Sequence, residues 1–255
     1  MKSIIEYIEQ KRESFEKSPF FTAYFDTTHY TTEEKLAWIT MKVFFTMCYC
    51  DINRFIFTTC DHVNNSIQAD LNTHSEEEDF HWQWMLADIE QLGMNKARSF
   101  TDTVRLIWSD EYSASRKLIY AILSLYAASP EQHTRFAIVE ALEATSITWF
   151  KHAQNLKDKH GKELQFFGKK HYKLESTHWI KGDEFSSKRI ELNNEERLAA
   201  KNVIDQIFLL FDDWLNSYWN LAQSLKSKNE TINFDAIIEK SKKFKFDELL
   251  GDYAN

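Results

Sequence analysis

Apolar and polar positions recur at helical spacing along most of the chain, so the pattern predicts an all-α fold. Polar breaks, several of them containing Gly or Pro, separate the periodic stretches and mark where helices end. The periodic segments lie at about residues 3–17, 31–60, 74–92, 100–112, 115–128, 129–159, 163–181 and 194–226. The segment at 100–112 is short, and a bundle of about seven helices is expected. The pattern therefore predicts a single-domain helical bundle.

Residue types that begin and end helices support several of these boundaries. Thr31 and Glu34 form a capping-box pattern at the start of the second helix. The Ser129-Pro130 pair supplies an N-cap residue and a first-turn proline. Gly93 follows the third expected helix, where a glycine commonly ends a helix.

No linker, internal repeat or low-complexity stretch divides the chain, so one domain is expected over residues 1–255. Residues 61–72 are polar and are expected to form a turn. Residues 229–255 are highly charged and are expected to be a loosely packed C-terminal tail.

The longest apolar stretch covers residues 36–59 and is interrupted by Lys42, Asp51 and Arg54. Charged side chains within a bilayer are costly, so this stretch is expected to be a buried core helix and not a membrane span. The first residues are amphipathic and charged throughout, unlike a secretory signal. We therefore expect a soluble, cytoplasmic protein with no membrane partner.

The composition agrees with long helices and narrows the function classes. The 255 residues include only five Gly and two Pro, the residues on which turns depend. The formal net charge of −8 repels nucleic-acid phosphates, so no nucleic-acid partner is expected. Cys48, Cys50 and Cys60 lie in one apolar segment and are expected to be reduced, buried thiols.

Two segments place histidine and glutamate on one face of an expected helix. Glu78 and His81 are three residues apart, and His171, Glu175 and His178 lie at positions i, i+4 and i+7. Residues at these spacings share a face of an α-helix. Each segment can therefore offer imidazole nitrogen and carboxylate oxygen to one metal site.

A third segment, between these two, places Glu140 and Glu143 in apolar surroundings. Carboxylates that face an apolar core are expensive unless they are paired or bind a metal. Iron sites that activate dioxygen use imidazole and carboxylate ligands, and facing helices of a bundle supply them in pairs. The three segments together predict a di-iron centre.

Each segment also has a structural interpretation. Ser75 and Glu78 fit a capping box, Glu140 fits a salt bridge with Arg135, and the histidines of the third segment fit the surface of a basic helix. The metal hypothesis is preferred because all three segments would otherwise have to be coincidences.

The order of these motifs resembles the haem-oxygenase-like di-iron oxidases, and the similarity covers most of residues 18–225. That family includes an undecene-forming fatty-acid decarboxylase, the N-oxygenases of nitrosourea and hydrazine biosynthesis, and the chlamydial death-domain-associated protein. The resemblance implies a haem-oxygenase-like bundle. The ligands that it implies are Glu78, His81, Glu143, His171, Glu175 and His178.

Three positions leave the ligand set open. His74 lies seven residues before His81, where many members of the family carry an acid, so it is an alternative to Glu78. Glu140 is an alternative to Glu143. The motifs also resemble ferritin-like N-oxygenases, whose four-helix bundle needs one more acid on the preceding helix. Asp51, which is expected to be buried, would supply that acid.

The resemblance implies an enzyme that activates dioxygen to oxidise a small molecule, either by N-oxygenation of an amine or by oxidative C–C cleavage of an amino or fatty acid. It implies two irons per chain, one of them labile, although manganese remains an alternative. No Gly-rich nucleotide-binding loop is present, so an external reductant must donate the electrons. A homodimer is an assembly common among such bundles.

Two other function classes remain open at this stage. One is a metal-free helical enzyme of the thiaminase or quinone-cofactor-synthase type, with Cys48 and Cys50 as candidate thiols. The other is a non-catalytic interaction protein. Both leave the histidine and glutamate pairs unexplained.

Overall fold

The computed structural model describes residues 1–58, 66–78, 80–181 and 191–242; the side chains of residues 66 and 177–181 lie outside that description. Within it, the chain forms eleven α-helices and one small antiparallel sheet. The helices are α1 (Lys2–Phe15), α2 (Thr32–Lys35), α3 (Ile39–Ile52), α4 (Ser66–Glu77), α5 (His81–Gln91), α6 (Phe100–Trp108), α7 (Ser113–Ala127), α8 (Gln132–Ala153), α9 (Lys169–Lys181), α10 (Asn194–Lys228) and α11 (Phe234–Lys242). The strands are β1 (Asn155–Lys157) and β2 (Glu163–Gly168). The mainly helical class is confirmed.

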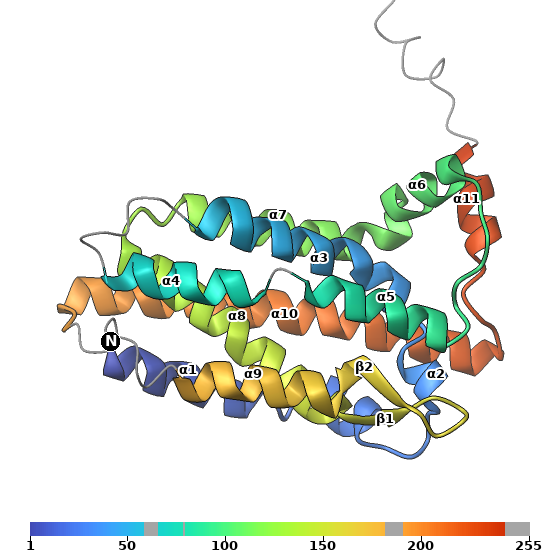
Figure 1. Cartoon of the computed structure of the whole chain (residues 1–255), viewed down its shortest axis with the longest axis horizontal. Helices are drawn as coiled ribbons and strands as arrows, with labels where there is room; N and C mark the ends of the chain where they lie inside the picture. The colour runs from blue at the N-terminus through green and yellow to red at the C-terminus, as the bar shows by residue number, and fades with distance from the viewer. Residues whose placement is uncertain (59–65, 79, 182–190, 243–255) are drawn as a thin grey trace, which may run out of the picture.

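Helix α8 is the central element of the bundle. It packs against α1, α4, α9 and α10, while α3 and α7 lie together along the opposite side of α10 (Figure 1). Because neighbours surround it, α8 is buried on nearly all sides, including Ala137, Ile138 and Ala141 at 0% exposure. A helix that is apolar all round belongs in a core.

Local capping residues set some helix boundaries as the sequence predicts, but the predicted start at the Ser129-Pro130 pair is wrong, because α8 begins at Gln132 with Glu131 as its N-cap residue. Thr31 and Glu34 form the expected capping box at the start of α2. Asn193 and Glu196 form a second one at the start of the 35-residue α10. Gly93 has φ +71° directly after α5, a left-handed conformation that glycine adopts without a steric penalty.

The single helix expected over residues 31–60 is wrong, because the chain bends between α2 and α3. The Lys35 ammonium donates to the carbonyls of Phe25 (2.6 Å) and Thr27 (2.8 Å), which ties α2 to the preceding loop. Trp38 is fully buried and stacks on Tyr218 of α10 at 4.6 Å. These tertiary contacts outweigh the continuous helical pattern.

The helix expected over residues 74–92 is also divided, into α4 and α5. Helix α4 ends at Glu77 and α5 begins at His81, and the Cys50 thiol donates to the backbone carbonyl of Glu78 directly after α4. Part of the expected turn at 61–72 is helical, since α4 begins at Ser66. Residues 61–65 lie outside the described part of the chain.

A β-hairpin separates α8 from α9, where the sequence pattern predicted two helices meeting near Gly161. β1 and β2 pair antiparallel, and Asp158 accepts the N–H groups of His160 and Lys162 in the turn between them. Gly161 has φ +79°. The hairpin moves the start of the last ligand helix to Lys169.

Part of the expected tail, residues 234–242, is helical. They form α11, which packs on α6 and buries Ile238. Residues 243–255 lie outside the described residues. Among the helices that the structure describes, no segment combines the length and the apolar character that a membrane span requires.

Candidate metal centre

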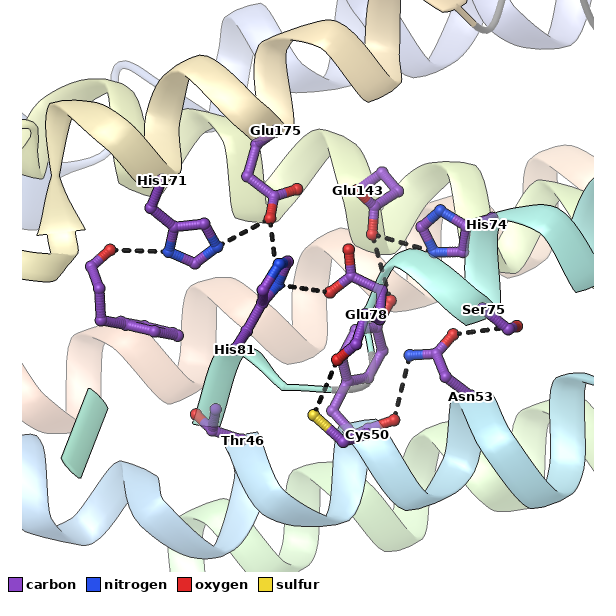
Figure 2. Close-up of polar contacts among 12 residues, drawn as sticks. Thr46, Cys50, Asn53, His74, Ser75, Glu78, His81, Glu143, His171 and Glu175 are labelled. Carbon is purple, nitrogen blue, oxygen red and sulfur yellow. Dashed lines mark hydrogen bonds and ion pairs between the residues drawn. The ribbon is translucent and has the colours of Figure 1, made fainter. Parts of the chain in front are cut away.

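Six buried or nearly buried side chains converge between α4, α5, α8 and α9 (Figure 2). The α9 group consists of His81, His171 and Glu175. The α8 group consists of His74, Glu78 and Glu143. Within each group, one candidate ligand atom from every residue lies within 4.8 Å of the others. Each group thus offers nitrogen and oxygen donors at the separation that a single metal ion needs.

In the α9 group, the ligand candidates are already oriented by neighbours. His171 Nε2 lies 2.8 Å from Glu175 Oε1, and His81 Nδ1 lies 3.4 Å from the same oxygen. His171 Nδ1 lies 2.8 Å from the carbonyl oxygen of Phe166, which can only accept, so Nδ1 donates. This is the outer hydrogen bond that commonly orients a metal-binding imidazole.

The support of this group extends to α5 and β2. Asp88 of α5 is fully buried and accepts the backbone N–H groups of Gln165 (2.6 Å), Phe166 (3.0 Å) and Phe167 (3.0 Å). Burial raises the pKa of Asp88 to about 6, although the three hydrogen bonds favour its ionised form. Asp88 therefore fixes the strand whose Phe166 carbonyl orients His171.

In the α8 group, the contacts are longer. His74 Nε2 lies 3.4 Å from Glu143 Oε1, and the Tyr49 hydroxyl donates to the same carboxylate oxygen at 3.2 Å. Glu78 belongs to no regular helix, because it lies in the connection between α4 and α5. The other two members lie on helices, His74 on α4 and Glu143 on α8.

Glu78 connects the two groups. Its Oε2 atom lies 3.0 Å from His81 Nδ1 in the α9 group, while its side chain also borders Glu143 and His74 (Figure 2). A carboxylate between two metal positions is the usual bridge in a dinuclear centre. Because α4 ends at Glu77 and α5 begins at His81, the side chains of His74, Glu78 and His81 can converge on the two groups.

Three carboxylates and three imidazoles share this volume, and protonation adjusts to burial. Burial by itself lowers the pKa of His81, but the charges of Glu78 and Glu175 outweigh it and raise the pKa above its usual value. Burial, together with the charges of Glu78 and Glu175, raises the pKa of Glu143 well above its usual range. Without a metal, protons on these side chains reduce the negative charge of the buried carboxylates. Bound cations would do the same.

A cavity of about 40 Å³ lies among these residues. Its lining combines the candidate ligands with aromatic and polar side chains: Lys42, Phe45, Thr46, Tyr49, Cys50, Glu78, His81, Glu143, Ser146, Phe150, Phe166, His171 and Glu175. At about 10–15 Å³ for each water, it has room for a few small atoms beside the ligands.

The structure brings together five of the six ligands predicted first: Glu78, His81, Glu143, His171 and Glu175. The sixth, His178, is in α9, but its side chain lies outside the described residues.

The three alternative ligands have different outcomes. His74 joins Glu78 in the α8 group and does not replace it. Glu140 is buried and outside both groups, and its charge contributes to the raised pKa of Glu143. Asp51 is exposed, so the expectation that it is buried is wrong. It lies on the outer face of α3, because Tyr49 and Ile52 take the inward positions.

Sequence reasoning missed Asp88, Tyr49 and Lys42 as parts of this site. Asp88 lies seven residues after His81, two helical turns along the same face, and this spacing is a usable signal. Tyr49 and Lys42 also lie seven residues apart, on the inward face of α3. A scan against protein-family models and a search of curated proteins find no match to this chain.

Proposed function

We propose that the protein is a non-haem di-iron oxidase or oxygenase that activates dioxygen to oxidise a small molecule. The observation that carries the proposal is the convergence of three imidazoles and three carboxylates in two adjoining groups joined by Glu78. Mixed nitrogen and oxygen ligation suits iron and manganese, whereas calcium and magnesium prefer oxygen alone.

The donor atoms fit such a metal pair in a further respect. His81 Nδ1 lies 3.0 Å from Glu78 Oε2 and 3.4 Å from Glu175 Oε1, so this nitrogen faces the carboxylates of both groups. Buried carboxylates are costly unless they are paired, and a bound cation would balance their charge. His171 has its outer nitrogen engaged by Phe166, which leaves Nε2 to face a metal.

When bound, an iron pair would supply the redox chemistry that activates dioxygen. The residues of this chain have other tasks. Burial and the nearby carboxylates raise the pKa of Glu143 and so favour its protonated form, whereas a bound cation would favour the carboxylate. The rings of Phe150 and Phe166, 5.2 Å apart, form an apolar wall of the cavity that keeps bulk water from it.

The reaction class proposed is N-oxygenation of an amine or oxidative C–C cleavage of an amino or fatty acid. Either reaction needs electrons, and we propose a separate reductant as the donor. The haem-oxygenase-like family relationship is part of the same proposal and is supported by the order of the ligand motifs along the chain.

The metal-free thiol enzyme is the second candidate, and Cys50 favours it because it lines the cavity. However, the Cys50 thiol donates to the Glu78 carbonyl at 3.1 Å, which is a structural role. Burial and the nearby Asp51 raise the pKa of the Cys48 thiol, so it is a poor nucleophile at neutral pH. The metal centre accounts for more of the site.

The test is anaerobic loading with ferrous iron, elemental analysis and optical spectroscopy on exposure to oxygen. The expected result is up to two irons per chain and an oxygen-dependent spectral change. Cys50→Ser is the matched comparison, because it keeps a donor to Glu78 and removes the thiol. Trace metal only after loading would refute the proposal, and loss of activity in Cys50→Ser with full metal content would favour the thiol enzyme.

A further inference from the structure

Lys42 is a buried cation in the wall of the metal cavity. It is on α3, is 5% exposed and lines the cavity beside the candidate ligands. Its Nζ atom donates to Thr46 Oγ1 at 2.9 Å. Among the described residues, no carboxylate lies within ion-pair distance of this ammonium.

Four aromatic rings surround the Lys42 ammonium. Its Nζ atom lies 5.1 Å from the ring centre of Phe45, 5.2 Å from Trp149, 4.8 Å from Phe166 and 5.6 Å from Trp214. Ring faces attract a cation but leave its N–H donors largely unused. Burial accordingly lowers the pKa of Lys42 to about 7.

Lys35 provides a contrast, because it is also a buried lysine of the same region. Its Nζ atom donates to two backbone carbonyls, those of Phe25 and Thr27, and so holds a loop in place. Within the described part of the chain, Lys42 donates only to the hydroxyl of Thr46, one turn away on its own helix, and this bond ties no second element. The two hydrogen bonds of Lys35 give its burial a structural reason. The bond of Lys42 to Thr46 does not give its burial such a reason.

The net charge of the two groups with metal bound indicates which kind of ligand would lie beside Lys42. The two groups contain three carboxylates, so two divalent cations would leave an excess of one positive charge. A protonated Lys42 adds a second. A buried excess of positive charge needs an anionic partner. The cavity of about 40 Å³ has room for a group of a few heavy atoms, which is the size of a carboxylate.

We propose that Lys42 binds the carboxylate group of the substrate and thereby restricts the enzyme to carboxylic acids. Two of its N–H donors face the carboxylate oxygens, and the rest of the substrate extends past the metal ligands. The inference rests on the proposed function and selects among its reactions, because a simple amine would enter as a cation and be repelled by Lys42 and the metals.

Formate is the probe, because it consists of little more than the carboxylate group. Formate is titrated calorimetrically into the zinc-loaded protein, since zinc accepts the same ligands without redox chemistry. Lys42→Met should weaken formate binding at least tenfold at unchanged zinc content. Lys35→Met is the control and should bind formate as the wild type does. Methylammonium should not bind to any of them.

Three outcomes would overturn the inference: no binding of formate to the wild type, equal binding to Lys42→Met, or binding of methylammonium. If Lys42→Met does not fold, Lys42→Gln takes its place, and Lys42→Arg should retain part of the binding. If zinc and iron do not load, the proposed function fails, and formate is then titrated into the metal-free protein. Binding that depends on Lys42 there supports the anion site, and its absence overturns it.

Discussion

The α9 group and the α8 group of the candidate metal centre are held by the fold in different ways. In the α9 group, the Phe166 carbonyl orients His171, and Asp88 fixes the strand that carries Phe166. In the α8 group, one hydrogen bond from Tyr49 supports Glu143, and Glu78 lies outside any helix. The first position is therefore prepared for a metal, whereas the second must rearrange to bind one.

Protonation separates the two groups further. Burial and neighbouring carboxylates keep the pKa of Glu143 well above its usual range, so this ligand must lose a proton before it coordinates. Two donor sets of similar composition therefore need not bind metal with equal affinity. We expect the α9 group to load first and the α8 group to be the labile one.

Removal of His171 is expected to have the largest effect on this comparison. His171→Ala removes an oriented nitrogen of the α9 group. Loss of a residue that only hydrogen-bonds a metal ligand costs about 10–100-fold in metal affinity, so loss of the ligand itself should cost at least about 100-fold. Iron content should fall to one ion or fewer per chain, and oxygen-dependent turnover should be lost.

Glu143→Gln is the counterpart of that variant in the α8 group. It should lose only the weaker metal and keep the first, as measured by elemental analysis after dialysis. If the two variants lose metal to the same extent, the two groups are not distinct in the way proposed.

Removal of Asp88 tests the support of the α9 group. Asp88→Ala leaves the buried N–H groups of Phe166 and Phe167 and the part-buried N–H of Gln165 without their acceptor, and each buried group costs about 1–3 kcal/mol. We expect the free energy of unfolding to fall by about 3 kcal/mol or more. The affinity of the α9 group should fall about 10–100-fold.

Urea unfolding and metal titration measure the two effects of Asp88→Ala. Glu163→Gln, an exposed position on the same strand, is the control and should change neither quantity. Normal metal binding in a destabilised Asp88→Ala protein would show that Asp88 does not position His171.

The pH dependence of metal binding follows from the raised pKa values. His81 and Glu143 hold protons to higher pH in the metal-free fold than they would in water, and this contribution to stability is lost as pH rises through the folded pKa. Metal must displace these protons, so its affinity should rise with pH, about tenfold per pH unit for each proton released.

Calorimetry in buffers of different ionisation enthalpy counts the protons released on metal binding. Each equivalent of metal should release protons, because His81 belongs to the α9 group and Glu143 to the α8 group. Proton release by the first equivalent alone would remove the proton of Glu143 as a cause of the difference between the groups.

Asp51→Ala should have the smallest effect. Asp51 is exposed, so its replacement should change the free energy of unfolding by less than about 0.5 kcal/mol. Metal content should be unchanged. A metal content halved by this variant would favour the ferritin-like arrangement, in which Asp51 is a ligand.

The features that the sequence predicts well are local ones. Spacing along one helix places His171 beside Glu175, and a capping pattern marks Thr31 as a helix start. Both depend on residues within a few positions of each other, and such interactions follow from helix geometry alone. The helical class follows in the same way from the periodicity of apolar residues.

The features that it misses depend on contacts between distant parts of the chain. The break at Glu78 involves Cys50, and the hairpin strand is fixed by Asp88, which lies far from it in sequence. The sequence offers His74 and Glu78 as alternatives, because members of the resembled family carry an acid at the position of His74, whereas the structure places both in the α8 group. Burial at Asp51 was predicted from its apolar neighbours, but the phase of α3 turns it outward.

The hairpin between α8 and α9 also determines where the chain tolerates changes in length. The turn at residues 158–161 lies at the far end of two short strands, and extra residues there leave the pairing and Phe166 in place. One residue inserted between Phe166 and His171 would instead rotate the imidazole by about 100° around the helix axis. Homologues should therefore differ in length at the turn and keep a constant number of residues from Phe166 to His171.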